Sequence, residues 1–136
     1  MRSINTLVVH CSASHQNATV DDIRRWHVDE RGWSDIGYHY VISADGVIHK
    51  GRPVERAGAH VRKRNHDSIG VCWIGGYKGI DNRTDAQRLA LRHLITELLV
   101  EHEIDLEEIK GHRDFDGVKK SCPNFDVQKW YFNEQS

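Results

Sequence analysis

The sequence lacks the features that mark several common classes of protein. Its 136 residues carry 19 basic and 20 acidic side chains, so no excess of one sign favours binding to nucleic acid or to an anionic membrane. The apolar run nearest the start, Leu7-Val8-Val9, is too short for a signal-peptide core or a membrane-spanning helix. We therefore expect a protein made in the cytoplasm, with no export signal and no membrane or nucleic-acid partner.

Cysteine is scarce, and its spacing does not suggest a disulfide framework. Cys11, Cys72 and Cys122 are an odd number of thiols that lie far apart in the sequence. This pattern fits a reducing compartment or a thiolate that serves as a metal ligand. Repeats, low-complexity tracts and linkers are also missing from the sequence. The length suits one domain over residues 1–136, which we expect to be a monomer.

Apolar and β-branched runs predict a mixed sheet of about five strands. They cover residues 4–11, 38–43, 47–51, 68–75 and 106–111. Asp45-Gly46 separates the second run from the third, and an Asp-Gly pair between β-prone segments predicts an antiparallel hairpin. Strict alternation in that hairpin would place Tyr38, Tyr40 and Ile42 on one face. The polar segment 53–67 predicts a long loop of the kind that often binds ligands.

Capping residues and helical spacing predict two helices. Thr19 with Asp22 begins a helix over about 20–30, and Thr84 with Gln87 begins one over 84–102. The expected apolar stripe of the second helix consists of Ala86, Leu89, Ala90, Leu94, Ile95, Leu98 and Leu99. We also expect a helical turn near the C-terminus, as the last secondary-structure element. The sequence thus predicts an α/β domain with helices packed against a mixed sheet.

The segment 110–126 holds two candidate metal ligands, His112 and Cys122, and His10 ends the first predicted strand. Imidazole and thiolate are ligand types that zinc prefers, and a catalytic zinc site takes three protein ligands and leaves a fourth position for water. If the two segments meet, the sequence predicts a zinc hydrolase. Alternatively, the histidines are surface or core residues and Cys122 is a small hydrophobic residue.

Hydrolysis of a carbonyl compound also needs groups that stabilise the oxyanion and move protons. Tyr38 and Lys120 are the candidates for these tasks. Lys120 lies two residues before Cys122, so it must lie near the metal if Cys122 is a ligand. Tyr38 could instead be a structural strand aromatic. A thiol hydrolase with Cys122 as nucleophile and His112 as base is a competing mechanism.

Five segments in order carry a family resemblance over essentially the whole chain. They are VVHCSAS, GWSDIGYHYVISADG, GAH with NHDSIGVCWIGG, TDAQ, and GHRDFDGVKKSCPNFD. Together they resemble the zinc-dependent N-acetylmuramoyl-L-alanine amidases of type 2, especially phage endolysins, whose fold is shared with peptidoglycan recognition proteins. The resemblance implies one zinc ion per chain and cleavage of the amide between the lactyl group and L-alanine in bacterial peptidoglycan. It also implies an enzyme held in the host cytoplasm until it is released to the cell wall.

The resemblance also assigns roles to residues of this chain. It implies zinc ligands at His10, His112 and Cys122, catalytic groups at Tyr38 and Lys120, and substrate-cleft positions at His60 and Asn65. Either of the last two could simply shape its loop. The spacing from His112 to Cys122 is longer than is usual in the family, which could displace Lys120, and another alignment would make Asp114 a ligand. A peptidoglycan-binding module without catalysis is the alternative function, although Cys122 favours the enzyme.

Overall fold

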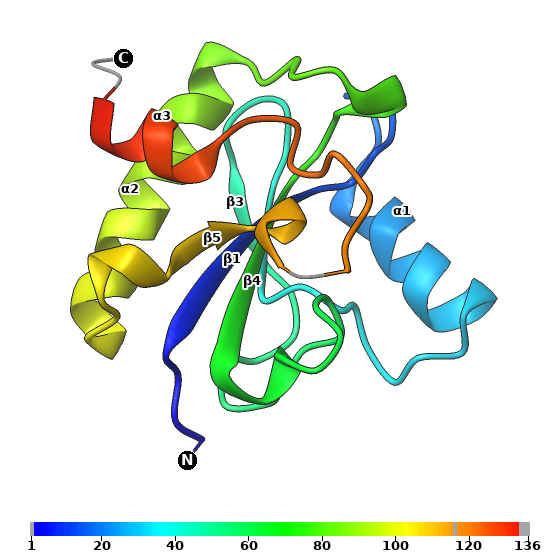
Figure 1. Cartoon of the computed structure of the whole chain (residues 1–136). Coiled ribbons are helices and arrows are strands. Elements are labelled where there is room, and N and C mark those ends of the chain that lie inside the picture. Colours follow the sequence, from blue (N-terminus) through cyan, green and yellow to red (C-terminus); the bar gives the residue numbers. More distant parts are fainter. Residues whose placement is uncertain (1, 116, 134–136) are drawn as a thin grey trace.

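Among residues 2–115 and 117–133, which the computed structural model describes, five strands form one mixed sheet (Figure 1). The strands are β1 (Thr6–Cys11), β2 (Tyr40–Ile42), β3 (Ile48–Lys50), β4 (Ser68–Trp73) and β5 (Ile109–Gly111), in the spatial order β3-β2-β4-β1-β5. β1 runs parallel to both β4 and β5, and β2 runs parallel to β4. β3 forms the antiparallel edge of the predicted hairpin. The predicted α/β fold is confirmed.

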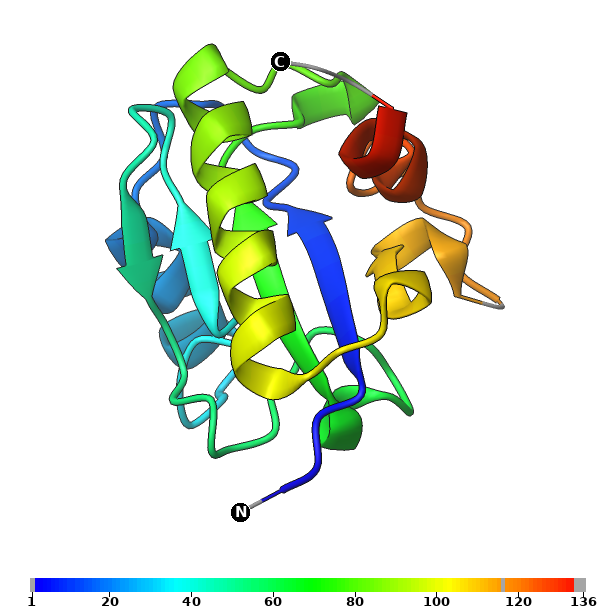
Figure 2. The ribbon, with the colours of Figure 1, turned by 90° about the vertical axis from the view of Figure 1, so that its left-hand side faces the viewer.

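Helices cover both faces of this sheet. α1 (Val20–Arg25) continues as a π-helical segment (Trp26–Glu30), α2 is Asp85–His102, and α3 is Val127–Asn133. Figure 2 shows α2 in front of the strands and α1 behind them. Capping boxes at Thr19 and Thr84 begin α1 and α2, as predicted. In the part of the chain that is described, none of these helices has the length and apolar character needed to cross a membrane.

The larger hydrophobic core lies between the sheet and α2. Leu7 and Val9 of β1 enter it together with Trp73 of β4 and Trp130 of α3. The predicted stripe of α2 is wrong at two positions, because Ala86 is exposed and Leu89 is 65% exposed, whereas Leu91 is completely buried. Sequence spacing fits several neighbouring stripes on a helix, and the position of the sheet selects one of them.

The opposite face of the sheet has a smaller core, and it holds the polar residues of interest. Ile23, Val41 and Cys72 belong to this second cluster, and Tyr38 packs against it. The prediction that Tyr38 shares a face with Tyr40 and Ile42 is therefore wrong, because those two residues pack on the α2 side. β2 begins only at Tyr40, so the alternation of a strand does not extend to Tyr38.

Leu89 and Leu91 provide a matched test of this packing. Leu91→Ala leaves a cavity under α2 and should lower the free energy of unfolding by about 2–5 kcal/mol. Leu89→Ala removes an exposed side chain and should change it by no more than about 0.5 kcal/mol. Urea unfolding followed by circular dichroism measures both values. Equal losses of unfolding free energy in the two variants would mean that Leu89 also packs in the core, as the sequence predicted.

Candidate active site

Strand pairing brings His10 and His112 together. His10 is the penultimate residue of β1, and His112 follows directly after β5. The parallel register pairs Val9 with Gly111, so the next residue on each strand is a histidine. Their ring centroids are 4.6 Å apart. Both lie at the carboxyl ends of parallel strands, where open α/β sheets commonly bind ligands.

Cys122 lies near these histidines because backbone groups close the loop that runs from His112 to Cys122. The Arg113 N–H donates to the Cys122 carbonyl at 2.9 Å, and the Cys11 N–H donates to Cys122 Sγ at 3.0 Å. The ligand atoms of His10, His112 and Cys122 all lie within 4.8 Å of one another, so the three residues could hold a metal ion. The longer spacing between His112 and Cys122 does not prevent this convergence.

Asp114 is not part of this group. Its carboxylate accepts the Gly111 N–H at 2.8 Å, and the side chain lies on the exposed surface. The metal-binding group found among residues 2–115 and 117–133 contains His112 and Cys122 but not Asp114. The structure therefore does not support the alternative alignment that makes Asp114 a ligand.

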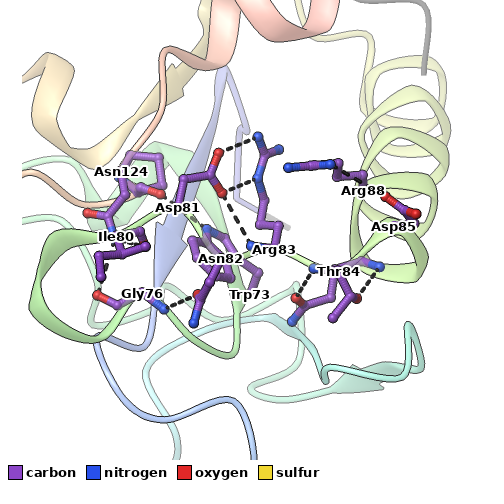
Figure 3. A network of polar contacts seen from close by, with 12 residues as sticks. Trp73, Gly76, Ile80, Asp81, Asn82, Arg83, Thr84, Asp85, Arg88 and Asn124 are labelled. Atoms are coloured by element: carbon purple, nitrogen blue, oxygen red, sulfur yellow. Dashed lines mark hydrogen bonds and ion pairs between the residues drawn. The ribbon is translucent and has the colours of Figure 1, made fainter.

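The segment that follows Cys122 is anchored to the connection between β4 and α2 (Figure 3). The Asn124 side-chain amide donates to the carbonyls of Gly76 at 3.2 Å and Ile80 at 2.9 Å. The Trp73 indole donates to the Pro123 carbonyl at 3.3 Å. These bonds hold the segment directly after Cys122 to the main body of the protein and so restrict the position of the thiol.

A cavity of about 450 Å³ opens over the three candidate ligands. All seven residues nominated from the sequence line it: His10, Tyr38, His60, Asn65, His112, Lys120 and Cys122. Lys120 is also close enough to His112 to lower its pKa, after the larger effect of burial. The longer loop therefore leaves Lys120 at the cavity.

Sequence reasoning missed other residues of the cavity wall. Trp33, Arg31 and Arg62 line it, and Trp26, predicted to be core packing, both lines it and packs against the smaller core. Arg31 and Trp33 follow the π-helical segment, and Arg62 lies in the loop before β4, so no periodic pattern pointed to them. Their only sequence signal was the basic character of the segment 53–67, which applies to Arg62 alone.

The lining of the cavity is cationic. Arg31, Arg62 and Lys120 contribute exposed positive charges, and no Asp or Glu is among the described residues of the wall. The chain as a whole has a formal net charge of −1. A local positive field in a cleft of a nearly neutral protein favours an anionic ligand.

The protonation states suit metal binding. Burial lowers the pKa of His10 well below its usual value, and the neighbouring His60 and His112 lower it further. Both candidate imidazole ligands are therefore neutral at pH 7, as ligation requires. A side-chain hydrogen bond with the Cys11 thiol, and then burial, raise the pKa of Cys122. This environment does not favour a free thiolate nucleophile, whereas a metal ion deprotonates a coordinating thiol.

Tyr38 is protonated at neutral pH. Its ring lies 5.2 Å from that of His10, between centroids. Burial raises the pKa of Tyr38 well above its usual value, and the nearby thiols of Cys72 and Cys122 raise it further. The hydroxyl therefore stays protonated and can donate a hydrogen bond beside the candidate metal ligands.

His60 and Asn65 use their polar atoms within the protein. Asn65 Oδ1 accepts the backbone N–H groups of His60 and Val61, each at 2.9 Å. The His60 ring contacts His10 through Nδ1 at 2.8 Å and Ser68 through Nε2 at 3.2 Å. These contacts fit the loop-shaping alternative, and a role in substrate binding stays a prediction for both residues.

The fold and the site are those of a hydrolase with a candidate metal-binding cleft at the carboxyl edge of a mixed sheet. A search of protein families matches residues 1–125 to the family described as N-acetylmuramoyl-L-alanine amidase. The chain belongs to this family, and it is an amidase.

Known proteins agree with this assignment. The chain is 41% identical to the endolysin of Enterobacteria phage T3 over 131 residues, which cover 92% of this chain and 83% of that protein. It is 40% identical to the endolysin of Escherichia phage T7, with coverage of 95% and 86%. The solved amidase LysCS from Clostridium intestinale superposes with a TM-score of 0.83 at 29% identity, with coverage of 98% and 86%. Drosophila PGRP-LB gives a TM-score of 0.80 at 26% identity, with coverage of 100% and 85%.

The buried histidines predict that the metal-free protein is sensitive to acid. Burial lowers the pKa of His27 and of His39 to about 4. Well above pH 6.5, the ordinary pKa of about 6.5 leaves these rings neutral in the folded and the unfolded chain. As the pH falls from about 6.5 towards 4, the unfolded chain binds protons that the folded chain does not, so the free energy of unfolding should fall.

Urea unfolding in the presence of a chelator, at about pH 7.5 and about pH 5, measures this effect. His39→Asn is the matched variant, because its side-chain oxygen can still accept the Gly70 N–H that His39 Nδ1 accepts at 3.0 Å. It removes one titrating group and should make the loss of stability with falling pH less steep. A midpoint that does not change with pH would contradict the prediction.

Proposed function

We propose that this amidase depends on one zinc ion per chain and cleaves the amide between the lactyl group of N-acetylmuramic acid and L-alanine in bacterial peptidoglycan. The convergence of His10, His112 and Cys122 beneath a cavity that Tyr38 and Lys120 also line carries the proposal. Two neutral imidazoles and one thiol are a donor set that suits zinc. The cavity leaves room for water and substrate above them.

Zinc bound there would supply a water molecule of lowered pKa and would polarise the scissile carbonyl. Tyr38, protonated and beside His10, would donate a hydrogen bond to the oxyanion that develops on that carbonyl. Lys120 would place a positive charge at the same oxyanion and can hand a proton to the leaving amine. Retention of both groups supports an enzyme over a binding module without catalysis.

The rest of the cavity suits a muropeptide. Trp26 and Trp33 offer apolar ring surface of the kind that packs against a sugar or its acetyl group. Arg31 and Arg62 face the same space and would attract the carboxylates of a peptide stem. The relatedness to phage endolysins supports a role in lysis, in which the protein reaches the wall after its release from the host cytoplasm.

Metal analysis and product analysis test the proposed reaction together. We expect about one zinc per chain, loss of cleavage after chelation and recovery when zinc is added. Purified peptidoglycan should release new L-alanine amino termini, which amine labelling followed by hydrolysis detects. Full activity in protein shown to be free of metal would overturn the zinc mechanism, and an increase in reducing sugar would indicate a glycosidase instead.

Lys120 and Lys119 form a matched pair for the catalytic role. Both are exposed, but Lys120 lines the cavity and Lys119 does not belong to its lining. Lys120→Ala should lower kcat by about 10²–10³, the effect of removing one group that stabilises an oxyanion. Lys119→Ala should leave kcat within about twofold, since surface substitutions away from a site have small effects.

Steady-state cleavage of a soluble muropeptide gives the two kcat values, and zinc content serves as the control for an intact site. Undiminished turnover in Lys120→Ala with zinc in place would show that the longer loop has removed Lys120 from the reaction.

A further inference from the structure

A chain of hydrogen bonds runs from the first candidate ligand into the protein interior. His10 Nε2 lies 2.8 Å from His60 Nδ1, and His60 Nε2 lies 3.2 Å from Ser68 Oγ. The Ser68 hydroxyl in turn donates to the Arg64 carbonyl at 2.7 Å. His10, His60 and Ser68 are all buried, with exposures of 1%, 9% and 0%. These buried side chains therefore serve as hydrogen-bond partners for one another, away from solvent.

The last bond in this chain fixes the direction of the others. A serine hydroxyl has one hydrogen, and a carbonyl oxygen can only accept, so the hydrogen of Ser68 is used on Arg64. Ser68 Oγ must then accept from His60 Nε2–H. A neutral imidazole carries one hydrogen, so His60 Nδ1 is an acceptor, and His10 Nε2 must donate to it.

This direction has a consequence for the candidate metal site. With its hydrogen on Nε2, His10 has a free lone pair on Nδ1. The reverse direction would place the hydrogen of His10 on Nδ1 and would use its Nε2 lone pair on His60, so neither nitrogen could bind a metal ion. A ligating histidine usually donates its other N–H to an acceptor that sets its tautomer and orientation.

We propose that His60 and Ser68 are positioning residues that hold the His10 proton on Nε2 and so prepare Nδ1 for the metal ion. The inference rests on the zinc site proposed above, and it gives His60 a task other than contact with substrate.

The packing around His60 supports this role. A Cβ atom added at Gly70 would lie 2.6 Å from His60 Cγ and 2.7 Å from its Nδ1, so the ring lies directly on the backbone of β4. Asn65 Oδ1 accepts the backbone N–H of His60 at 2.9 Å. The backbone of β4 therefore limits movement of the ring on one side, and Asn65 holds the loop that carries it.

Zinc affinity of the full-length protein, measured by competition with a chromophoric chelator, tests the proposal without substrate. His60→Leu removes the acceptor and should weaken zinc binding by about 10–100-fold, the usual effect of losing such a partner. His60→Asn can place an oxygen near the former Nδ1 and should stay within about threefold of the wild type. Ser68→Ala lets His60 adopt either tautomer and should fall between these two values.

His39→Asn is the control for the loss of a buried imidazole. The His39 ring lies 5.7 Å from that of His60, between centroids, and hydrogen-bonds to Gly70 and Arg56 rather than to a candidate ligand. Its zinc affinity should remain within about twofold of the wild type, because it has no partner among the ligands. Circular dichroism confirms that each variant is folded.

Histidine side-chain ¹⁵N NMR of the metal-free wild type tests the tautomer directly. His10 should show a protonated Nε2 and an unprotonated Nδ1, and Ser68→Ala should show a mixture. A His10 proton on Nδ1 in the wild type would overturn the proposal, even if His60→Leu fails to fold. Unchanged zinc affinity with a raised KM in folded His60→Leu would overturn it too and would return His60 to the substrate. If the wild type binds no zinc, the proposed metal fails, but the NMR result still decides the tautomer.

Discussion

The parallel register between β1 and β5 is the constraint on which the site depends. It aligns Val9 with Gly111 and so places His10 beside His112, although the two histidines are far apart in the sequence. A shift of one residue in β1 would turn His10 into the core beneath α2 and bring Val9 to the cavity. The completely buried side chains of Leu7 and Val9 make such a shift unfavourable. The hydrophobic core thus fixes the position of His10, the first candidate ligand.

The two faces of the sheet divide stability and chemistry between them. The face under α2 contains most of the large apolar side chains, including Trp73 and Trp130. The face under α1 has a smaller apolar cluster, which leaves space for a cavity and for buried histidines. Each buried polar group needs a partner to offset its desolvation. His27 accepts the Gly37 N–H at 2.9 Å and His39 accepts the Gly70 N–H, so these rings are satisfied by backbone.

The fold could be predicted largely because its signals are local. Alternating and helical patterns and the Thr84 capping box lie within single elements, and the structure confirms them. The errors arose where a local pattern depends on its surroundings: Leu89 and Leu91 both fit a helical stripe, and Tyr38 stands just outside the strand whose alternation it was given. The strands that bring the histidines together could be recognised, but their register could not.

The candidate ligands could be nominated from residue types and from a family resemblance, and the resemblance also placed His60 in the cleft, but the contact of His60 with His10 could not be predicted. His60 contacts a histidine 50 residues away, and nothing in the spacing of either residue indicates that contact. Arg31 and Trp33 reach the cavity from a segment without periodicity. Whether such a residue reaches the cavity depends on the path of its loop. That path is set by the packing of the whole fold and leaves no local pattern in the sequence.

Loop closure explains why the segment between His112 and Cys122 can differ in length without loss of the ligands. The bond from Arg113 to Cys122 and the anchors of Asn124 fix its two ends. Lengthening a loop with fixed ends costs little, because even a doubling adds only about 0.6 kcal/mol of closure entropy. Lys120 lies two residues before the anchored end, so its position follows from Cys122 rather than from the length of the loop. The candidate metal ligands and Lys120 can therefore keep their places when the length of this loop changes.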